Sequence, residues 1–185
     1  MFVWTDIETT GLDPARDRIL ALGVIITDNT FREIARDEWV VYVPAEDAAL
    51  QNMDPHVREM HTKSGLLEGL EEFGFNLDEV EEMACEFIDA VVGDAPSESI
   101  KNRPCMAGNS VAFDREFIRE HLPELHRRYN YRLLDVSTLK VLALATVPGA
   151  REWNDSRPEA PHTPLADLEG SLLELAHWRE ELRRG

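Results

Sequence analysis

Basic residues are scarce in this sequence. Its 185 residues include 19 lysines and arginines against 36 aspartates and glutamates, which gives a formal net charge of −17 at pH 7. Proteins that bind long nucleic acids usually present a basic surface, and no run of lysines and arginines here exceeds two residues. A polyanionic substrate must therefore be short, or it must bind where other groups cancel the local negative charge.

Cysteines and long apolar runs are also scarce. Cys85 and Cys105 lie far apart, which indicates neither a metal motif nor a disulfide framework and fits a reducing cytosol. The sequence contains no stretch of about 18 apolar residues, so it predicts no membrane span. The acids Asp6 and Glu8 interrupt the first apolar run, so it does not read as a signal peptide. We therefore expect a cytoplasmic protein without a membrane partner, folded as a single domain over residues 1–185.

The hydrophobic pattern predicts an α/β fold. Apolar runs predict strands over 2–8, 18–27 and 39–43, and the turn signal Asp28-Asn29 joins the second and third of them into a hairpin. Helical spacing predicts helices over 76–92, 111–122 and 164–183, and short apolar runs predict strands over 104–107 and 133–136. The segments 94–103 and 146–162 read as loops, the second of them long and rich in proline.

Two acids stand in the first predicted strand. Asp6 and Glu8 are two residues apart, so their side chains share one face of the strand. Adjacent carboxylates repel each other unless a proton or a cation lies between them, and hard cations such as Mg²⁺ or Mn²⁺ prefer carboxylate oxygens. The alternative is a strand that ends at the surface with two solvated acids, because a lone D-x-E pattern is common.

Two further acids and a histidine fit the same interpretation. Asp114 shares a helix face with Phe117 and Ile118, where a carboxylate needs a compensating partner unless it lies at the edge of the stripe. Asp167 falls in the first turn of the last predicted helix, and His162 precedes that helix on the loop. A loop histidine is most often simply solvated, but beside carboxylates it is a candidate general base.

Together these five residues predict a metal-dependent hydrolase. Four carboxylates are enough to hold two divalent cations about 3.5–4 Å apart, the arrangement used for in-line displacement at phosphorus. In this interpretation His162 takes a proton from the attacking water.

Several blocks of the sequence, in the same order, resemble a known family. They are DIETTGLDPARDRIL (6–20), HTKSGL (61–66), GNSVAFDREFIREHLPEL (108–125), YRLLDVSTLK (131–140) and an H-x-x-x-x-D pattern at 162–167. The set is similar to the DEDDh 3′→5′ exonucleases of the ribonuclease H-like superfamily, and within it to the oligoribonucleases. The resemblance implies a ribonuclease H-like α/β fold, with a mixed five-stranded sheet flanked by helices. It also implies an exoribonuclease that degrades short RNA oligonucleotides to 5′-mononucleotides with two Mg²⁺ or Mn²⁺ ions.

The resemblance also assigns roles to individual residues. It places the metal-binding acids at Asp6, Glu8, Asp114 and Asp167 and the general base at His162. It implies a base-separating wedge at Leu12, a cap on the substrate's 5′-phosphate, and a homodimer whose partner brings a tyrosine near the site. The cap residues are Ser110, Arg132 and Ser137, and the tyrosine is Tyr131.

The sequence departs from the family pattern at three positions. His56 stands where the family usually has a tryptophan that stacks on the substrate, Thr9 where it has methionine, and Ala21 where it has an acid. Two alternatives stay open: a DNA-directed proofreading or repair exonuclease of the same superfamily, and a catalytically inactive exonuclease fold used for binding. Because all five catalytic positions are filled, the sequence favours an enzyme.

Overall fold

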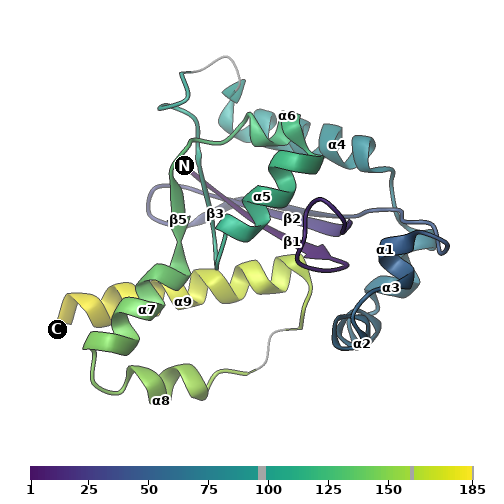
Figure 1. Ribbon diagram of the computed structural model, residues 1–185. Helices are drawn as coiled ribbons and strands as arrows, with labels where there is room; N and C mark the ends of the chain where they lie inside the picture. Colours follow the sequence, from purple (N-terminus) through teal and green to yellow (C-terminus); the bar gives the residue numbers. More distant parts are fainter. Residues whose placement is uncertain (96–98, 159–160, 185) are drawn as a thin grey trace.

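A mixed five-stranded sheet forms the centre of the computed structural model, which describes residues 1–95, 99–158 and 161–184 (Figure 1). The strand order is β3-β2-β1-β4-β5. β1 is antiparallel to β2 and β2 to β3, whereas β4 is parallel to both β1 and β5. The strands are β1 (Phe2–Thr9), β2 (Ile19–Thr27), β3 (Glu33–Val40), β4 (Cys105–Gly108) and β5 (Leu133–Asp135). The predicted ribonuclease H-like sheet and its antiparallel first hairpins are confirmed.

Helices cover both faces of this sheet. In Figure 1, α4, α5 and α6 lie over one face and α7, α8 and α9 over the other, while α1 to α3 gather at one end. Among the described residues, no helix combines the length and apolarity needed to cross a membrane. The helices are α1 (Ala48–Gln51), α2 (Pro55–Lys63), α3 (Leu66–Glu72), α4 (Leu77–Val92), α5 (Ala112–His121), α6 (Pro123–His126), α7 (Val136–Thr146), α8 (Ala150–Asp155) and α9 (Pro164–Arg184).

The alternation of side chains along β1 separates two apolar clusters. Val3 and Ile7 belong to the cluster under α4 and α5, whereas Trp4 belongs to the cluster under α7 and α9. Trp4 and Trp178 of α9 are both fully buried in the second cluster. Because both faces of β1 are packed, its carboxylates lie inside the molecule rather than at a free surface.

Most of the predicted elements are present. The helix predicted over 76–92 is α4, and a capping box of Asn76 and Glu79 closes its first turn. The helices predicted over 111–122 and 164–183 correspond to α5 and α9, and the short strands predicted near 104–107 and 133–136 correspond to β4 and β5.

The predicted third strand over 39–43 was largely wrong. β3 runs from Glu33 to Val40. Val41 lies outside the strand: its N–H donates to the carbonyl oxygen of Leu20, and it forms an isolated bridge with Phe75. β3 lies at the edge of the sheet, and most of its side chains are exposed and polar. An edge strand of this kind lacks the apolar run that the prediction relied on.

The loop predicted over 146–162 was also wrong in part, because it contains α8. This helix is only six residues long, too short to show helical periodicity. Gly149, at φ 80°, precedes it, and Trp153 stacks on His177 of α9. Neither α7 nor the short helices α1, α2, α3 and α6 had been predicted. Residues 96–98 and 159–160 of the two predicted loops lie outside the described residues.

Candidate active site

The site begins near the C-terminal end of strand β1. Asp6 and Glu8 project from the same face, as their spacing predicts. Their partners across β2 are small: Asp6 pairs with Gly23, and Glu8 pairs with Ala21. The small residues at these two positions of β2 leave room above them for the start of α9.

Gly23 allows α9 to approach the sheet closely. A Cβ built at Gly23 would lie 2.5 Å from the Cβ of Pro164, the first residue of α9. Glu38 of β3 is the cross-strand partner of Gly23. The backbone N–H of Leu165 donates to a carboxylate oxygen of Glu38 at 3.0 Å. The first turn of α9 is therefore fixed directly over Asp6, and Asp167 lies in that turn.

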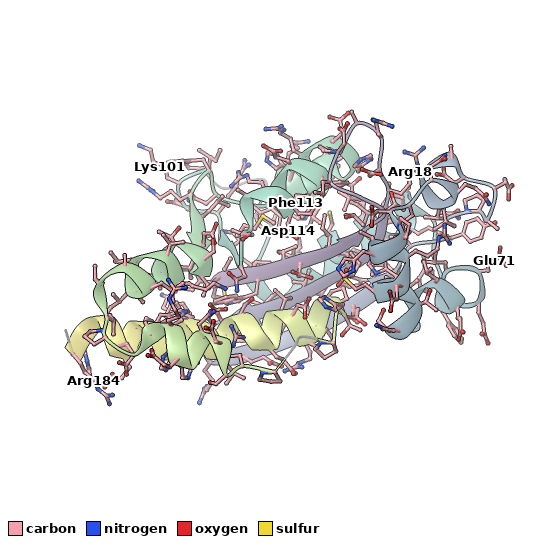
Figure 2. The ribbon with its side chains drawn as sticks, turned by 60° about the horizontal axis from the view of Figure 1, so that its bottom comes forward. Arg18, Glu71, Lys101, Phe113, Asp114 and Arg184 are labelled. Atoms are coloured by element: carbon pink, nitrogen blue, oxygen red, sulfur yellow. The ribbon has the colours of Figure 1, made fainter. Side chains whose placement is uncertain are left out.

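Asp114 reaches β1 from the opposite layer. Because β4 pairs with β1 only along Phe2–Trp4, the backbone of β1 beyond that point has a free edge. The N–H of Ile7 donates to Oδ1 of Asp114 at 3.1 Å. In Figure 2, Asp114 lies over the sheet near the centre of the molecule, whereas Lys101 and Arg184 lie at its edges.

Three carboxylates converge at one point. Asp6, Glu8 and Asp167 each offer an oxygen, and these atoms lie within 4.8 Å of one another. Asp114 adjoins the trio but is not a member of it. Oδ1 of Asp167 is buried, and no hydrogen-bond partner for it is found among the described residues. The geometry thus brings the four predicted acids together, three of them around one possible ion.

The electrostatics of these acids reflect crowding and burial. Burial raises the pKa of Glu8 to about 8, with further increases from Asp167 and Asp114. Burial also raises the pKa of Asp114 to about 7, although the Ile7 N–H opposes that change. The pKa of Asp6 is raised well above its usual value by burial first and then by Asp114 and Glu8. Uncompensated carboxylates in this position favour a bound proton or cation.

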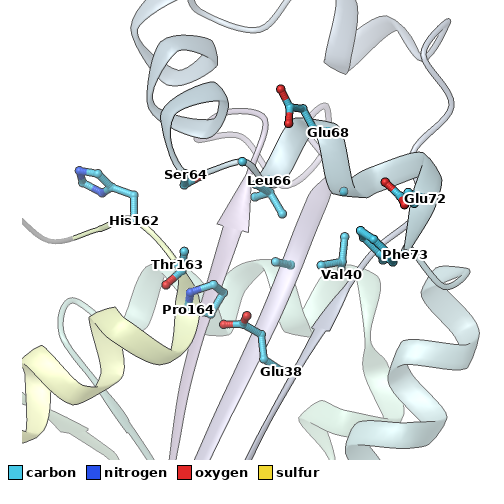
Figure 3. A pocket seen from close by; sticks show the side chains of 13 residues that line it. Glu38, Val40, Ser64, Leu66, Glu68, Glu72, Phe73, His162, Thr163 and Pro164 are labelled. Atoms are coloured by element: carbon cyan, nitrogen blue, oxygen red, sulfur yellow. The ribbon is translucent and has the colours of Figure 1, made fainter.

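His162 lies just before α9, next to the trio. Burial raises the pKa of Asp167, and His162 opposes part of this rise through its charge and through its backbone N–H, which donates to the carboxylate. The φ of 56° at His162 turns the chain sharply before Thr163 and Pro164. Figure 3 shows the imidazole pointing away from Pro164, and it borders a cavity of about 640 Å³ that His56 also lines. The hydrogen bond from His162 to Asp167 is therefore made by the backbone of the histidine, not by its imidazole.

A second histidine, His61 of α2, also reaches this site. It is fully buried, its Nε2 bonds the carbonyl oxygen of Thr9 at 2.9 Å, and its Nδ1 lies 3.8 Å from a carboxylate oxygen of Glu8. Burial lowers its pKa, which favours the neutral ring. Sequence reasoning had noted only the HTKSGL block that contains this residue, without giving it a role.

The predicted phosphate cap is partly assembled. Ser110 and Ser137 both direct their backbone N–H groups to Oδ1 of Asp135, at 3.0 and 2.9 Å. Arg132 is exposed, and its guanidinium lies over the ring of Tyr131, 4.7 Å from the centroid. One aspartate, which sequence reasoning did not single out, thus holds the two serines together.

The predicted base contacts lie at the surface. Leu12 is 81% exposed in the loop after β1, which suits a wedge, and His56 is exposed on α2. Sequence reasoning also missed Glu38 and Gly23. In the sequence, Gly23 appears only as a small residue within an apolar run, and Glu38 appears only as one more acidic residue.

Comparison with known proteins agrees with this arrangement. The sequence matches the RNase T exonuclease family over residues 3–175. The chain belongs to this exonuclease family. The oligoribonuclease of Tropheryma whipplei (strain Twist) is 36% identical over 99% of this exonuclease and 94% of the relative, and that of Thiobacillus denitrificans is 36% identical over 98% and 94%. The predicted exonuclease activity and the predicted resemblance to oligoribonucleases are confirmed.

Solved structures share the fold of this exonuclease. Exonuclease I from Methylocaldum szegediense has a TM-score of 0.65 at 20% identity over 96% of this chain. E. coli exonuclease I in complex with a dT13 oligonucleotide has a TM-score of 0.66 at 16% identity over 99%. This exonuclease spans only 40% and 42% of those two chains, so the likeness concerns the fold of one part of each chain.

Proposed function

We propose that this exonuclease is a divalent-metal-dependent 3′→5′ exoribonuclease that hydrolyses short RNA oligomers and releases 5′-mononucleotides. The observation that carries the proposal is the convergence of Asp6, Glu8 and Asp167, with a buried oxygen of Asp167 that no described group satisfies. The curated relatives at 34–36% identity, all called oligoribonucleases, support the choice of RNA over DNA.

The donor set fits a hard divalent cation. Carboxylate oxygens are the preferred ligands of Mg²⁺ and Mn²⁺, and a cation would relieve the repulsion that raises the pKa values of Asp6 and Glu8. When bound, such an ion acidifies a coordinated water and stabilises negative charge on the phosphate. We propose that Asp6, Glu8 and Asp167 hold one ion and that Asp114, next to Asp6, contributes to a second.

His162 is the proposed proton acceptor. Its backbone N–H is hydrogen-bonded to Asp167, and this bond keeps His162 at the edge of the acid trio. In the proposed reaction His162 removes a proton from the water that attacks the phosphorus. The bond to the 3′-oxygen of the preceding nucleotide breaks, and that oxygen gains a proton. The products are a 5′-mononucleotide and an oligomer one residue shorter.

The substrate contacts follow from the cap and the wedge. Asp135 holds Ser110 and Ser137 together through their backbone N–H groups. The Ser110 hydroxyl would donate to a terminal 5′-phosphate, whereas the Ser137 hydroxyl donates to Asp135 at 2.6 Å and would have to turn toward the phosphate. Arg132 would add a planar cation that suits phosphate geometry. Leu12 would lie between the two bases, and His56 would stack on one of them with less area than tryptophan offers.

The charge of the chain supports a short substrate. Binding of a long strand relies on many phosphate contacts along a basic groove, whereas this chain carries 36 acidic against 19 basic residues. A short oligomer requires only the acid trio with its ions, the wedge and the cap. We propose a preference for two to about five nucleotides.

Three further features belong to the proposal. Residues 1–185 form a single exonuclease domain, the protein acts in the cytoplasm, and two copies form a homodimer. The exposed Tyr131, next to Arg132, would then reach the cap of the partner copy.

A hydrolysis assay tests the function as a whole. Purified protein with Mn²⁺ or Mg²⁺ is given 5′-labelled RNA and DNA of two to about twenty-four nucleotides. The proposal predicts loss of single nucleotides from the 3′ end, with RNA dimers degraded fastest. An endonucleolytic ladder, or no hydrolysis of RNA at all, would overturn it.

A DNA-directed exonuclease is the second candidate. The fold likeness to exonuclease I, one of whose structures holds a dT13 oligonucleotide, and Thr9 in place of the usual methionine favour it. The DNA arm of the same assay distinguishes the two, because this candidate predicts faster hydrolysis of DNA and little dependence on length.

A further inference from the structure

A cavity that contains two cationic side chains adjoins the acid trio. It has a volume of about 400 Å³, and its charged lining residues are Asp6, Asp167, Glu174, Lys140 and Arg157. In a chain with a net charge of −17, two cationic side chains in one cavity beside the proposed catalytic acids are unusual. The proposed mechanism does not use either of them.

A buried carboxylate fixes both cations. Glu174 of α9 is fully buried, and it pairs with Lys140 at 3.1 Å and with Arg157 at 2.6 Å. It also accepts hydrogen bonds from Asn109 at 2.7 Å and from Trp178 at 2.9 Å. The simplest interpretation is that the cations only neutralise Glu174. Glu174 carries a single negative charge, however, so the two cations leave the three charged side chains with one positive charge in excess.

The cations also keep part of their surface for the cavity. The side chains of Lys140 and Arg157 are 29% and 30% exposed, whereas that of Glu174 is 0% exposed. Arg157 is held in addition by the carbonyl oxygen of Gly170 at 3.3 Å and by the ring of Trp153, 5.4 Å from its centroid. A guanidinium has five N–H donors in a rigid fork, so a preorganised arginine can still bind an anion.

The cavity extends away from the proposed base. It follows α9 from Asp167 to Glu174, roughly 10 Å along the helix axis. His162, the proposed base, precedes the N-terminus of α9 and does not line this cavity. In-line displacement places the attacking and leaving oxygens on opposite sides of the phosphorus. With His162 on the attacking side, the nucleotides upstream of the scissile bond would extend toward Lys140 and Arg157.

The cavity also adjoins the proposed phosphate cap. Asn109 directly precedes Ser110, and Lys140 lies three residues after Ser137, on the same face of α7. Neither cap serine lines the cavity itself. The cap and the cavity are thus neighbouring but separate places for negative charge.

We propose that Lys140 and Arg157 form a second phosphate subsite, which binds the internal phosphodiester upstream of the scissile bond in oligomers of three or more nucleotides. The proposal rests on the proposed function, because it assumes that RNA is cleaved at the acid trio. It explains how an acidic protein accepts more than a dinucleotide. In a longer oligomer, the internal phosphodiester bound at this subsite takes the place of the terminal 5′-phosphate that the cap binds in a dinucleotide.

Steady-state kinetics on two substrates test the subsite. The diadenylate ApA and the triadenylate ApApA, both with a free 5′-hydroxyl, differ in one upstream phosphodiester. Arg157→Gln is expected to raise KM for ApApA about tenfold, as expected for one lost charge-assisted hydrogen bond, and to leave KM for ApA within about twofold. Arg157→Lys should restore most of the affinity for ApApA.

Controls separate binding from packing. Arg151→Gln changes an exposed arginine of α8 outside the cavity and should alter neither substrate. Lys140→Gln leaves Glu174 paired with Arg157 and should repeat the selective effect, and melting temperatures show whether each variant is folded. Equal increases in KM for ApA and ApApA would overturn the subsite and leave Arg157 a packing residue. Failure of the wild type to hydrolyse either substrate would instead overturn the proposed function, and the subsite with it.

Discussion

Gly23 of β2 lies directly beneath Pro164 of α9, where any side chain would collide: a Cβ at Gly23 would lie 2.5 Å from the Cβ of Pro164. Gly23 is also the cross-strand partner of Asp6. Asp167 follows Pro164 within the first turn of α9. The spacing of the acid trio therefore depends on a residue that carries no chemistry of its own.

Gly23→Val should lower activity about 100-fold, because a displacement of about 1 Å in a catalytic group has an effect of that size. The added side chain would move the start of α9, and Asp167 with it, away from Asp6. Rates of AMP release, together with Mn²⁺ affinity by calorimetry, measure the effect. Gly69→Ala in α3 is a matched control, because its added Cβ meets nothing closer than 3.8 Å. Wild-type activity in Gly23→Val would contradict this account.

The metal-free protein should become less stable as the pH rises from about 5 to about 8. The pKa of Glu8 is about 8 and that of Asp114 about 7 in the folded protein, against about 4 when unfolded. In this window the native state keeps protons that the unfolded state releases, so the free energy of unfolding falls.

Melting temperatures in EDTA at both ends of that range measure this change. Added Mn²⁺ should raise the melting temperature at pH 8, because it binds the native state. Glu8→Gln removes one titrating group and should show a smaller dependence on pH. A metal-free melting temperature that rises with pH would show that the acids are not crowded as described.

His162→Ala should lower kcat by about 10²- to 10⁴-fold, the usual contribution of a general base. Substrate affinity should change little, because the acid trio and the phosphate cap are intact. Single-turnover rates and equilibrium binding, measured on the same variant, separate the two effects. If the variant loses affinity as strongly as it loses rate, His162 positions the substrate rather than moving a proton.

Arg132→Ala should slow hydrolysis of a 5′-phosphorylated dinucleotide more than that of longer RNA. A dinucleotide has few other contacts, so the loss of one charge-assisted bond, about 1.5–3 kcal/mol, is not offset elsewhere. Rates on pApA and on RNA of about twenty-four nucleotides provide the comparison, with Arg151→Gln as the control. An equal loss on both lengths would favour the general exonuclease.

Three of the proposed catalytic acids were predictable because each stands in a strong local pattern. Asp6 and Glu8 interrupt a buried strand, and Asp114 interrupts an apolar helix stripe. Burying a carboxylate without a partner is unfavourable, so such interruptions indicate chemistry. The strands β1 and β2 and the helices α4, α5 and α9 were predictable because their apolar pattern reflects burial on one or both faces.

The remaining features depend on contacts that no local pattern contains. β3 is an exposed edge strand without an apolar run, and α8 is held by the stacking of Trp153 on His177 of α9. Glu174 reads in sequence as one more charge on a helix. Its burial, and the convergence of Lys140 and Arg157 on it, exist only once α7, α8 and α9 are packed together.

The central claim is that the carboxylates of Asp6, Glu8 and Asp167 hold a divalent cation that hydrolysis requires. The most direct measurement is the initial rate of AMP release from pApA in Mn²⁺, then in excess EDTA, and again after Mn²⁺ is restored. The account predicts that EDTA abolishes the rate without unfolding the protein and that Mn²⁺ restores it. A full rate in excess EDTA would contradict it.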